Sequence, residues 1–344
     1  MHARMFLAAV AIFAAGMAPA VARDLTVVAR GDSLQAALTN AYLHPFTDVT
    51  GGRTTAVTWE GGIAALRDQL KAPDNAWDLI IANPDEVAAG CAEGIFEKID
   101  WTAIGGKDHY QPWGVSDCGV GATIANTVLA WDKDKFPVTP TWADFWDVAK
   151  YPGKRGLRRD VRGALEIALL ADGVAPGDIY KTLSTKDGVE RAFQKLDQLR
   201  PYIVWWQNGA EAAKILGSGD VLMTSAPSGA IATAARLDVR NFGIQFGSSL
   251  YTVLSWVIPK GSPNLRASQQ FLYFTGMPLI EARMVRNDGR VGPAKGLNDG
   301  LPPELQAISP TTQANLAMAL MIDTNFWHDN LAKLGPRFDA WLGK

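Results

Sequence analysis

The sequence carries almost no excess charge of either sign. Its 33 lysine and arginine residues stand against 35 aspartate and glutamate residues, a formal net charge of −2 over 344 residues. Proteins that bind nucleic acid or acidic membrane surfaces by electrostatic attraction concentrate positive charge. We therefore expect neither a nucleic-acid partner nor binding to a membrane surface.

Sequence motifs of catalysis are also missing. The chain contains no G-x-x-x-x-G-K-[ST], no G-x-G-x-x-G, no H-E-x-x-H and no G-x-S-x-G. Beyond residue 22 its histidines are His44, His109 and His328, and no two have the spacing of metal ligands. We expect no catalytic residue, no cofactor and no metal. A secreted α/β hydrolase stays open as an alternative, because catalytic triads assemble in space and not in sequence.

Apolar runs long enough to span a bilayer, about 20 residues, are absent as well. The segment from Met5 to Met17 is apolar, follows Arg4 and precedes Ala20-Val21-Ala22. A basic start, a short apolar core and small residues at a cleavage point are typical of a signal peptide. We expect residues 1–22 to be removed, with cleavage near Ala22, and the mature protein to be periplasmic.

Cysteine is scarce, with Cys91 and Cys118 alone in the chain. An oxidising compartment favours disulfide formation, so we expect these two to be bridged. The alternative is a pair of buried thiols.

The patterns that are present predict an α/β fold. Buried strand patterns at 25–29, 54–59 and 78–82 alternate with helical spacing of apolar residues. Such alternation predicts a mainly parallel sheet with helices on both faces. Residues 119–137 read as a long extended segment, 142–157 as a helix and a turn, and 250–258 as a strand that could carry the chain back.

Several sequence blocks carry a resemblance to a known family. They are DLIIANPDEVAAGCAEGIFEKIDW, TWADFWDVAKYPGKRGL with the following LEIALLADGV, and SWVIPKGSPN. Their order along the chain resembles bacterial ABC-transporter extracellular solute-binding proteins of the spermidine/putrescine-binding-like family. The resemblance implies a type II periplasmic binding fold. Two α/β lobes, each a mixed, mainly parallel sheet flanked by helices, would be joined by a hinge of extended crossings.

The same resemblance implies a domain organisation and partners. We expect residues 23–128 in lobe 1, 129–248 in lobe 2, 249–298 returning to lobe 1, and 299–344 as C-terminal helices that pack on the lobes. A small-molecule ligand would bind in the cleft between the lobes. The receptor, as a monomer, would deliver it to an inner-membrane ABC permease.

The resemblance also implies which residue types hold a polyamine. Receptors of that branch use aromatic side chains and carboxylates, which suit ammonium groups. In this sequence Arg30 and Ser33 stand at two of the aromatic positions, and Arg290 stands at a third. Leu254 and Gly163 stand where carboxylates are expected, whereas the neighbouring Asp160 is retained.

Arginine at these places favours a different ligand, because its planar guanidinium suits carboxylate, phosphate or sulfonate groups. Arg30 lies where a strand meets a helix N-terminus, which is a usual ligand crevice and favours anions. We expect an acid-bearing or zwitterionic ligand, with Glu60 or Asp85 holding an amine. A polyamine remains the alternative within the receptor class.

Each candidate also has a structural alternative. Arg30 could pair with Asp32 or Asp85, Arg290 could brace a turn, and Trp206 could be core. The residues expected to contact the ligand are Arg30, Ser33, Trp59, Glu60, Asp85, Arg162, Trp206, Ser225, Tyr251 and Arg290.

Overall fold

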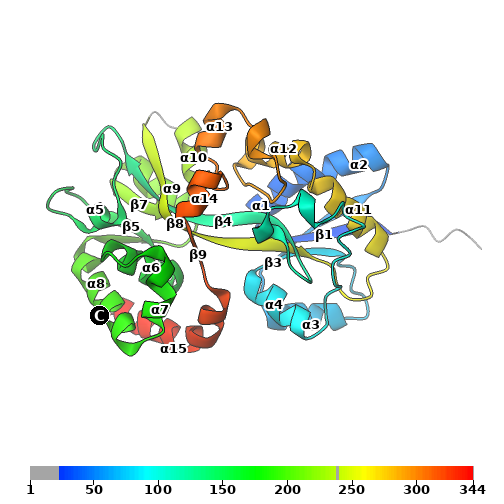
Figure 1. The fold of residues 1–344 in the computed structure, drawn as a ribbon, viewed down its shortest axis with the longest axis horizontal. Coiled ribbons are helices and arrows are strands. Elements are labelled where there is room, and N and C mark those ends of the chain that lie inside the picture. The colour runs from blue at the N-terminus through cyan, green and yellow to red at the C-terminus, as the bar shows by residue number, and fades with distance from the viewer. Residues whose placement is uncertain (1–22, 238–239, 344) are drawn as a thin grey trace, which may run out of the picture.

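Two α/β lobes lie side by side and are joined by the long strands β4 and β8 in a computed structural model (Figure 1). The structure describes residues 23–237 and 240–343. The predicted signal peptide, residues 1–22, lies outside the described residues. In the described part of the chain, no helix is both long enough and apolar enough to cross a membrane.

One sheet runs through the whole molecule in the order β2-β1-β3-β8-β4-β7-β5-β6, and β9 pairs with β8. β1, β2 and β3 are parallel, β5 is parallel to β6 and β7, and β8 and β4 are antiparallel to their neighbours β3 and β7. The strands are β1 (Leu25–Arg30), β2 (Thr54–Trp59), β3 (Leu79–Ala82), β4 (Val120–Asp132), β5 (Arg155–Arg158), β6 (Ile203–Trp206), β7 (Met223–Ala226), β8 (Phe242–Val257) and β9 (Leu320–Met321).

Helices cover both faces of the sheet. We call the part built on β1–β3 lobe 1 and the part built on β5–β7 lobe 2. Lobe 1 carries α1 (Asp32–Leu38), a π-helical turn (Thr39–Leu43), α2 (His44–Thr50), α3 (Ile63–Lys71), α4 (Pro84–Ala92), α11 (Leu265–Thr275) and α12 (Pro278–Asp288). Lobe 2 carries α5 (Trp142–Trp146), α6 (Val161–Ala171), α7 (Ile179–Leu183), α8 (Lys186–Leu199), α9 (Gly209–Ser218) and α10 (Ser228–Leu237). The C-terminal segment adds α13 (Pro303–Ala307), α14 (Gln313–Met318) and α15 (Thr324–Leu342).

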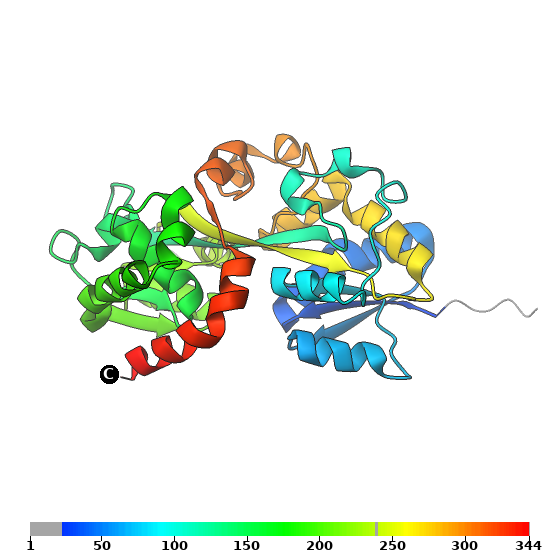
Figure 2. The same ribbon diagram turned by 60° about the horizontal axis from the view of Figure 1, so that its bottom comes forward.

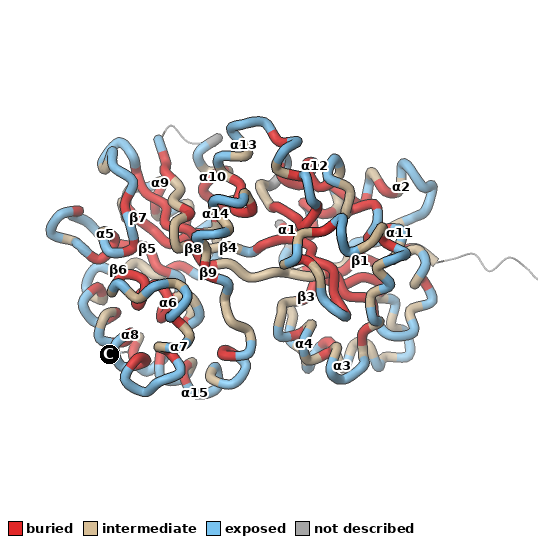
Figure 3. Tube along the Cα trace, in the orientation of Figure 1, coloured by how far each residue is buried: buried red, intermediate tan, exposed pale blue. Residues whose placement is uncertain are grey.

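The core of lobe 1 follows from the alternation of side chains along its strands. Val27 and Ala29 of β1 face the helices α1, α2 and α11, whereas Val28 faces α3 on the other side. Successive residues of a strand point to opposite faces, so a strand buried on both sides must be apolar throughout. This is why LTVVA is apolar except for the buried Thr26, and the strand ends at the partly exposed Arg30. Figure 3 shows the buried strands of lobe 1 in red.

Lobe 2 has the same construction, with one core on each face of its sheet. Leu157 and Met223 belong to the core formed with α5, α6, α8 and α15, whereas Ala226 belongs to the core formed with α9 and α10. The C-terminal helix thus contributes to the core of lobe 2.

An arginine is buried inside lobe 2. Arg155 opens β5, and its exposed fraction is 0%. Its guanidinium donates to the backbone carbonyl oxygens of Phe145 at 2.6 Å, Tyr151 at 2.5 Å and Gly153 at 2.8 Å. Burial lowers the pKa of Arg155 to about 10. The side chain therefore closes the connection from α5 to β5.

The pairing of β4 with β8, which connects the lobes, is interrupted. β4 and β8 pair over most of their length, but the register shifts between Thr127 and Leu129. Opposite this shift, Ser248 has a left-handed backbone with φ 55°, and its carbonyl oxygen accepts a hydrogen bond from the Trp142 indole at 2.9 Å. A bulge of this kind bends a strand locally. β9 joins β8 in parallel just beyond it, at Leu250.

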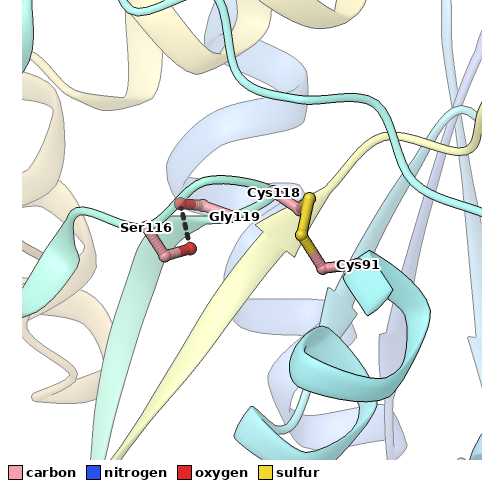
Figure 4. Close-up of a disulfide and its surroundings, with 4 residues drawn as sticks. All are labelled: Cys91, Ser116, Cys118 and Gly119. Atoms are coloured by element: carbon pink, nitrogen blue, oxygen red, sulfur yellow. Dashed lines mark hydrogen bonds between the residues drawn. A yellow bond between two sulfur atoms is a disulfide. The ribbon is translucent and has the colours of Figure 1, made fainter. Parts of the chain in front are cut away.

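A disulfide joins Cys91 of α4 to Cys118, which precedes β4 (Figure 4). The Ser116 hydroxyl donates to the Gly119 carbonyl at 2.9 Å in the same turn. The bridge encloses a sequence separation of 27 residues. It therefore ties the helix that follows β3 to the start of a crossing strand.

Candidate functional site

A cavity of about 470 Å³ lies between the lobes. Lobe 1, the crossing strands, lobe 2 and the C-terminal segment each supply part of its wall. Lobe 1 gives Arg30, Asn83, Pro84 and Asp85, and the crossing strands give Ala125, Thr127, Thr252 and Leu254. Lobe 2 gives Leu157, Arg158, Asp160, Arg162, Gly163, Ala164, Ile167 and Ser225, and the C-terminal segment gives Ile322, Thr324, Trp327, His328 and Leu331.

The topology explains this position. The carboxyl ends of β1 and β3 in lobe 1, and of β5 and β7 in lobe 2, all reach the cavity. The helices α4 and α6 begin there, so their N-termini point toward it. Crevices at the carboxyl ends of parallel strands are the common ligand sites of open α/β sheets. Helix N-termini add a preference for negative charge.

On the lobe 1 side, Arg30 forms an ion pair with Glu86. The Glu86 carboxylate is 1% exposed and also accepts backbone hydrogen bonds from Gly62 at 2.7 Å and Asn83 at 2.9 Å. The guanidinium lies over the Trp59 ring, 5.3 Å from its centroid. Arg30 is therefore held by a partner on α4 and a platform on β2, and one edge of it faces the cavity.

Gly61 is required by the same arrangement. Its φ is +90°, and a Cβ at this position would overlap the Arg30 guanidinium. A left-handed backbone and close side-chain approach both favour glycine. The sequence Trp59-Glu60-Gly61-Gly62 thus makes room for the arginine.

On the lobe 2 side, Asp160 lies between two arginines. Its carboxylate is 3.4 Å from Arg162 Nε and 3.9 Å from Arg158 Nη1. Its Oδ1 also accepts from the backbone N–H of Arg162 at 3.0 Å. The backbone of Arg162 and Gly163 departs from helical geometry, and Gly163 has φ 90°. Regular helix begins only at Ala164, which leaves this turn and its arginines at the cavity wall.

The charges on the two sides of the cavity do not cancel locally. On lobe 1 the charge of Arg30 is balanced by Glu86, and Asp85 has no hydrogen bond or ion pair among the described residues. On lobe 2 two arginines share one carboxylate. The lobe 1 side of the cavity therefore has an excess negative charge at Asp85, and the lobe 2 side has an excess positive charge from its two arginines.

Glu166 lies behind the lobe 2 wall and is completely buried. It accepts hydrogen bonds from the backbone N–H of Gly163 at 2.8 Å, the Tyr180 hydroxyl at 2.9 Å and the Trp327 indole at 2.7 Å. Burial raises the pKa of Glu166 despite these donors. Because Gly163 and Trp327 both line the cavity, Glu166 fixes two parts of its wall to each other.

The raised pKa values predict how stability depends on pH. Burial raises the pKa of Glu166, and raises that of Glu281 in lobe 1 well above 4.5. The folded protein therefore holds protons that the unfolded chain has released, and this stabilisation is lost as pH rises from about 4.5 through the folded-state values. We expect the midpoint of urea unfolding of the ligand-free protein to fall from pH 5 to pH 8. Glu281→Gln should flatten that slope, and an unchanged slope would contradict this origin.

The structure brings four of the predicted ligand contacts to the cavity: Arg30, Asp85, Arg162 and Ser225. Among the described side chains Arg30 pairs with Glu86 and not with Asp85, and the Asp32 side chain is not among the described ones. Trp59 is 8% exposed and lies behind Arg30, while Glu60 follows β2 outside the wall. Ser33 belongs to α1, and its side chain is not among the described ones.

Three further predicted contacts lie away from the cavity wall. Trp206 is 2% exposed in the core between β6, α9 and α10, so its prediction as a cleft residue does not hold. Tyr251 lies on β8 between Leu250 and the cavity residue Thr252, and so faces the other side of the sheet. Arg290 follows α12, and burial lowers its pKa.

Several wall residues escaped prediction from the sequence. Arg158 ends β5, whose residues up to Leu157 are predicted from the sequence as part of a helix and a turn. Asn83 and His328 were not among the expected contacts. The cavity residues Thr324, Trp327, His328 and Leu331 recur at i, i+3, i+4 and i+7 of one helix, a signal that could have found them.

Among the described residues, no group of three or more histidine, cysteine, aspartate or glutamate side chains could hold a metal ion.

Residues 41–318 match the family described as bacterial extracellular solute-binding protein. A protein named gamma-aminobutyric acid-binding protein, from Pseudomonas aeruginosa, is 38% identical over 332 residues, 96% of this chain and 94% of the relative. The solved structure of the "Atu4243-GABA receptor" is similar with a TM-score of 0.81 and 27% identity, over 93% of this chain and 98% of that one.

A spermidine/putrescine substrate-binding protein from Streptococcus pneumoniae, PotD, is similar with a TM-score of 0.77, over 93% of this chain and all of that one. At 17% identity this likeness concerns the fold alone. It leaves the polyamine alternative with no more support than a shared architecture.

Proposed function

The chain belongs to the bacterial extracellular solute-binding protein family, and we propose that it is a receptor for a small zwitterionic ω-amino acid such as gamma-aminobutyric acid. Proteins of this family bind small solutes outside the cytoplasmic membrane and deliver them to an ABC permease.

The single observation that carries the proposal is the separation of charge across the cavity. Asp85 on lobe 1 can accept the ligand's ammonium group, and Arg158 and Arg162 on lobe 2 can bind its carboxylate. Charge-assisted hydrogen bonds of this kind are the strong ones. The names of the 38% identical relative and of the GABA receptor agree with such a ligand.

A flexible chain between the two charged ends also suits the cavity. Leu157, Ala164 and Leu254 make part of the wall apolar. Methylene groups gain about 0.8 kcal/mol each when they are removed from water. A dication such as putrescine would place its second ammonium group against the arginines, which disfavours it.

Binding to both sides would draw the lobes together as a hinge, and the closed form would dock on the permease. We propose the monomer as the active unit and the periplasm as its location. No catalytic role is proposed, since the family binds its solutes.

A ligand screen tests the proposal directly. A ligand that binds only the folded state raises the melting temperature by mass action. We expect 4-aminobutanoate to give a larger shift than butanoate, butylamine, putrescine or spermidine. A larger shift with putrescine or spermidine would contradict the proposal.

The Asp85→Asn substitution should weaken binding of 4-aminobutanoate by about 10- to 100-fold, because it removes a charged hydrogen-bond partner of the ammonium group. Binding of butanoate, which has no amine, should change little. Isothermal titration calorimetry measures both affinities. The matched control is Asp68→Asn, an exposed carboxylate on α3 outside the cavity wall, which should leave both unchanged.

A further inference from the structure

The first two turns of α15 present one face to the cavity. Thr324, Trp327, His328 and Leu331 lie on that face and are all wall residues. Asp323 caps the start of this helix, because its carboxylate accepts from Phe326 N–H at 3.0 Å. This face of α15 therefore forms a part of the cavity wall that does not come from the sheet of either lobe.

This wall is fixed to lobe 2. The Trp327 indole donates to the buried carboxylate of Glu166, and the Trp341 indole donates to Asp197 of α8 at 2.7 Å. Arg337 pairs with Glu190 of α8 at 2.7 Å. Because contacts occur along the length of α15, the helix should move together with lobe 2.

The same helix reaches toward lobe 1. α15 packs against α4, the helix whose first turn carries Asp85. Figure 2 shows α15, in red, running from the middle of the molecule along lobe 2. A ligand held between Asp85 and the lobe 2 arginines would thus lie beside the face of α15. Because both of its ends are held, an extra methylene would bow its chain against that face.

One apolar side chain of this wall is open to solvent. Leu331 is 38% exposed although its side chain is apolar and lines the cavity. Such a side chain would be covered when the lobes close over a ligand.

We infer that α15, through Trp327, His328 and Leu331, is the wall that sets the length of the ligand. The inference rests on the proposed function, because it assumes an ω-amino acid in this cavity. Trp327 is fixed by Glu166, so its position defines one limit. Leu331, one turn further along the helix, is the residue whose size can change that limit without disturbing the core.

The experiment compares affinities for 4-aminobutanoate and 5-aminopentanoate by calorimetry in the wild type, Leu331→Ala and Leu331→Phe. A pocket discriminates one methylene by about 10-fold or more. We expect Leu331→Ala to shift the affinity ratio about 5- to 10-fold toward the longer compound. Leu331→Phe should shift the ratio toward the shorter one. Lys333→Ala, exposed on the same helix and outside the wall, should keep the wild-type ratio.

If both Leu331 variants bind with the wild-type ratio, the inference is wrong and the proposed function stands. If the wild type binds neither amino acid, the proposed function itself fails, and the inference fails with it. Melting temperatures without ligand check that the variants fold.

Discussion

Arg30→Ala should lower both the affinity for the ligand and the stability of the ligand-free protein. The substitution removes the cation that balances Glu86, a carboxylate 1% exposed beside the cavity. Leaving a buried charged group less satisfied costs about 1–3 kcal/mol, which urea unfolding measures. Loss of the guanidinium, and of its ordered pairing with Glu86, from the cavity wall should weaken binding of 4-aminobutanoate about 100-fold.

A second substitution separates these two contributions. Arg30→Ala/Glu86→Gln removes the unpaired charge, and its amide oxygen can still accept from Gly62 N–H. We expect stability to return to near the wild-type value but affinity to stay reduced, because Arg30 also lines the cavity. Full recovery of affinity would show that Arg30 acts only by balancing Glu86.

Arg155→Met should destabilise the protein by about 4 kcal/mol, since it leaves backbone carbonyl oxygens without a donor, at about 1–3 kcal/mol for each buried group. The side chain has no exposed surface, and three backbone carbonyl oxygens would lose their donor. Methionine fills similar volume but supplies no N–H group. Urea unfolding of the ligand-free protein measures the change.

The matched control is Lys154→Met, an exposed neighbour that should change stability by less than about 0.5 kcal/mol. Because β5 ends at Arg158, a cavity residue, Arg155→Met should also weaken ligand binding. A loss of less than about 1 kcal/mol would contradict the structural role assigned to Arg155.

The sequence predicted the lobe 1 strands and their parallel order because each is a short, continuous apolar run. β5 escaped prediction because RGLR is short and begins and ends with arginine. Arg155 is buried only because an adjacent turn offers three carbonyl oxygens, and no periodicity in the sequence reports that.

The candidate site was predictable where a residue follows directly from a strand end, as for Arg30, or opens a helix, as for Asp85. The pairing of Arg30 with Glu86 was not predictable, because Arg30 had nearer candidate partners along the chain in Asp32 and Asp85. Trp206 shows the opposite error, since an aromatic residue on a strand fits a core and a cleft equally well, and only packing decides. Residues of α15 were missed because the C-terminal segment that carries them is distant in sequence from the lobes and crossing strands that form the rest of the cavity.

The shift in the β4–β8 ladder between Thr127 and Leu129 has an energetic consequence for ligand capture. The proposed closure of the lobes would bend the strands there, at residues that already lack regular pairing, so the strand pairs on either side would stay intact. Opening and closing would then exchange few backbone hydrogen bonds, which keeps their contribution to the free-energy gap between the two forms small. Because apparent affinity falls with the fraction of protein in the competent form, a small gap leaves most of the ligand's contact energy available as affinity.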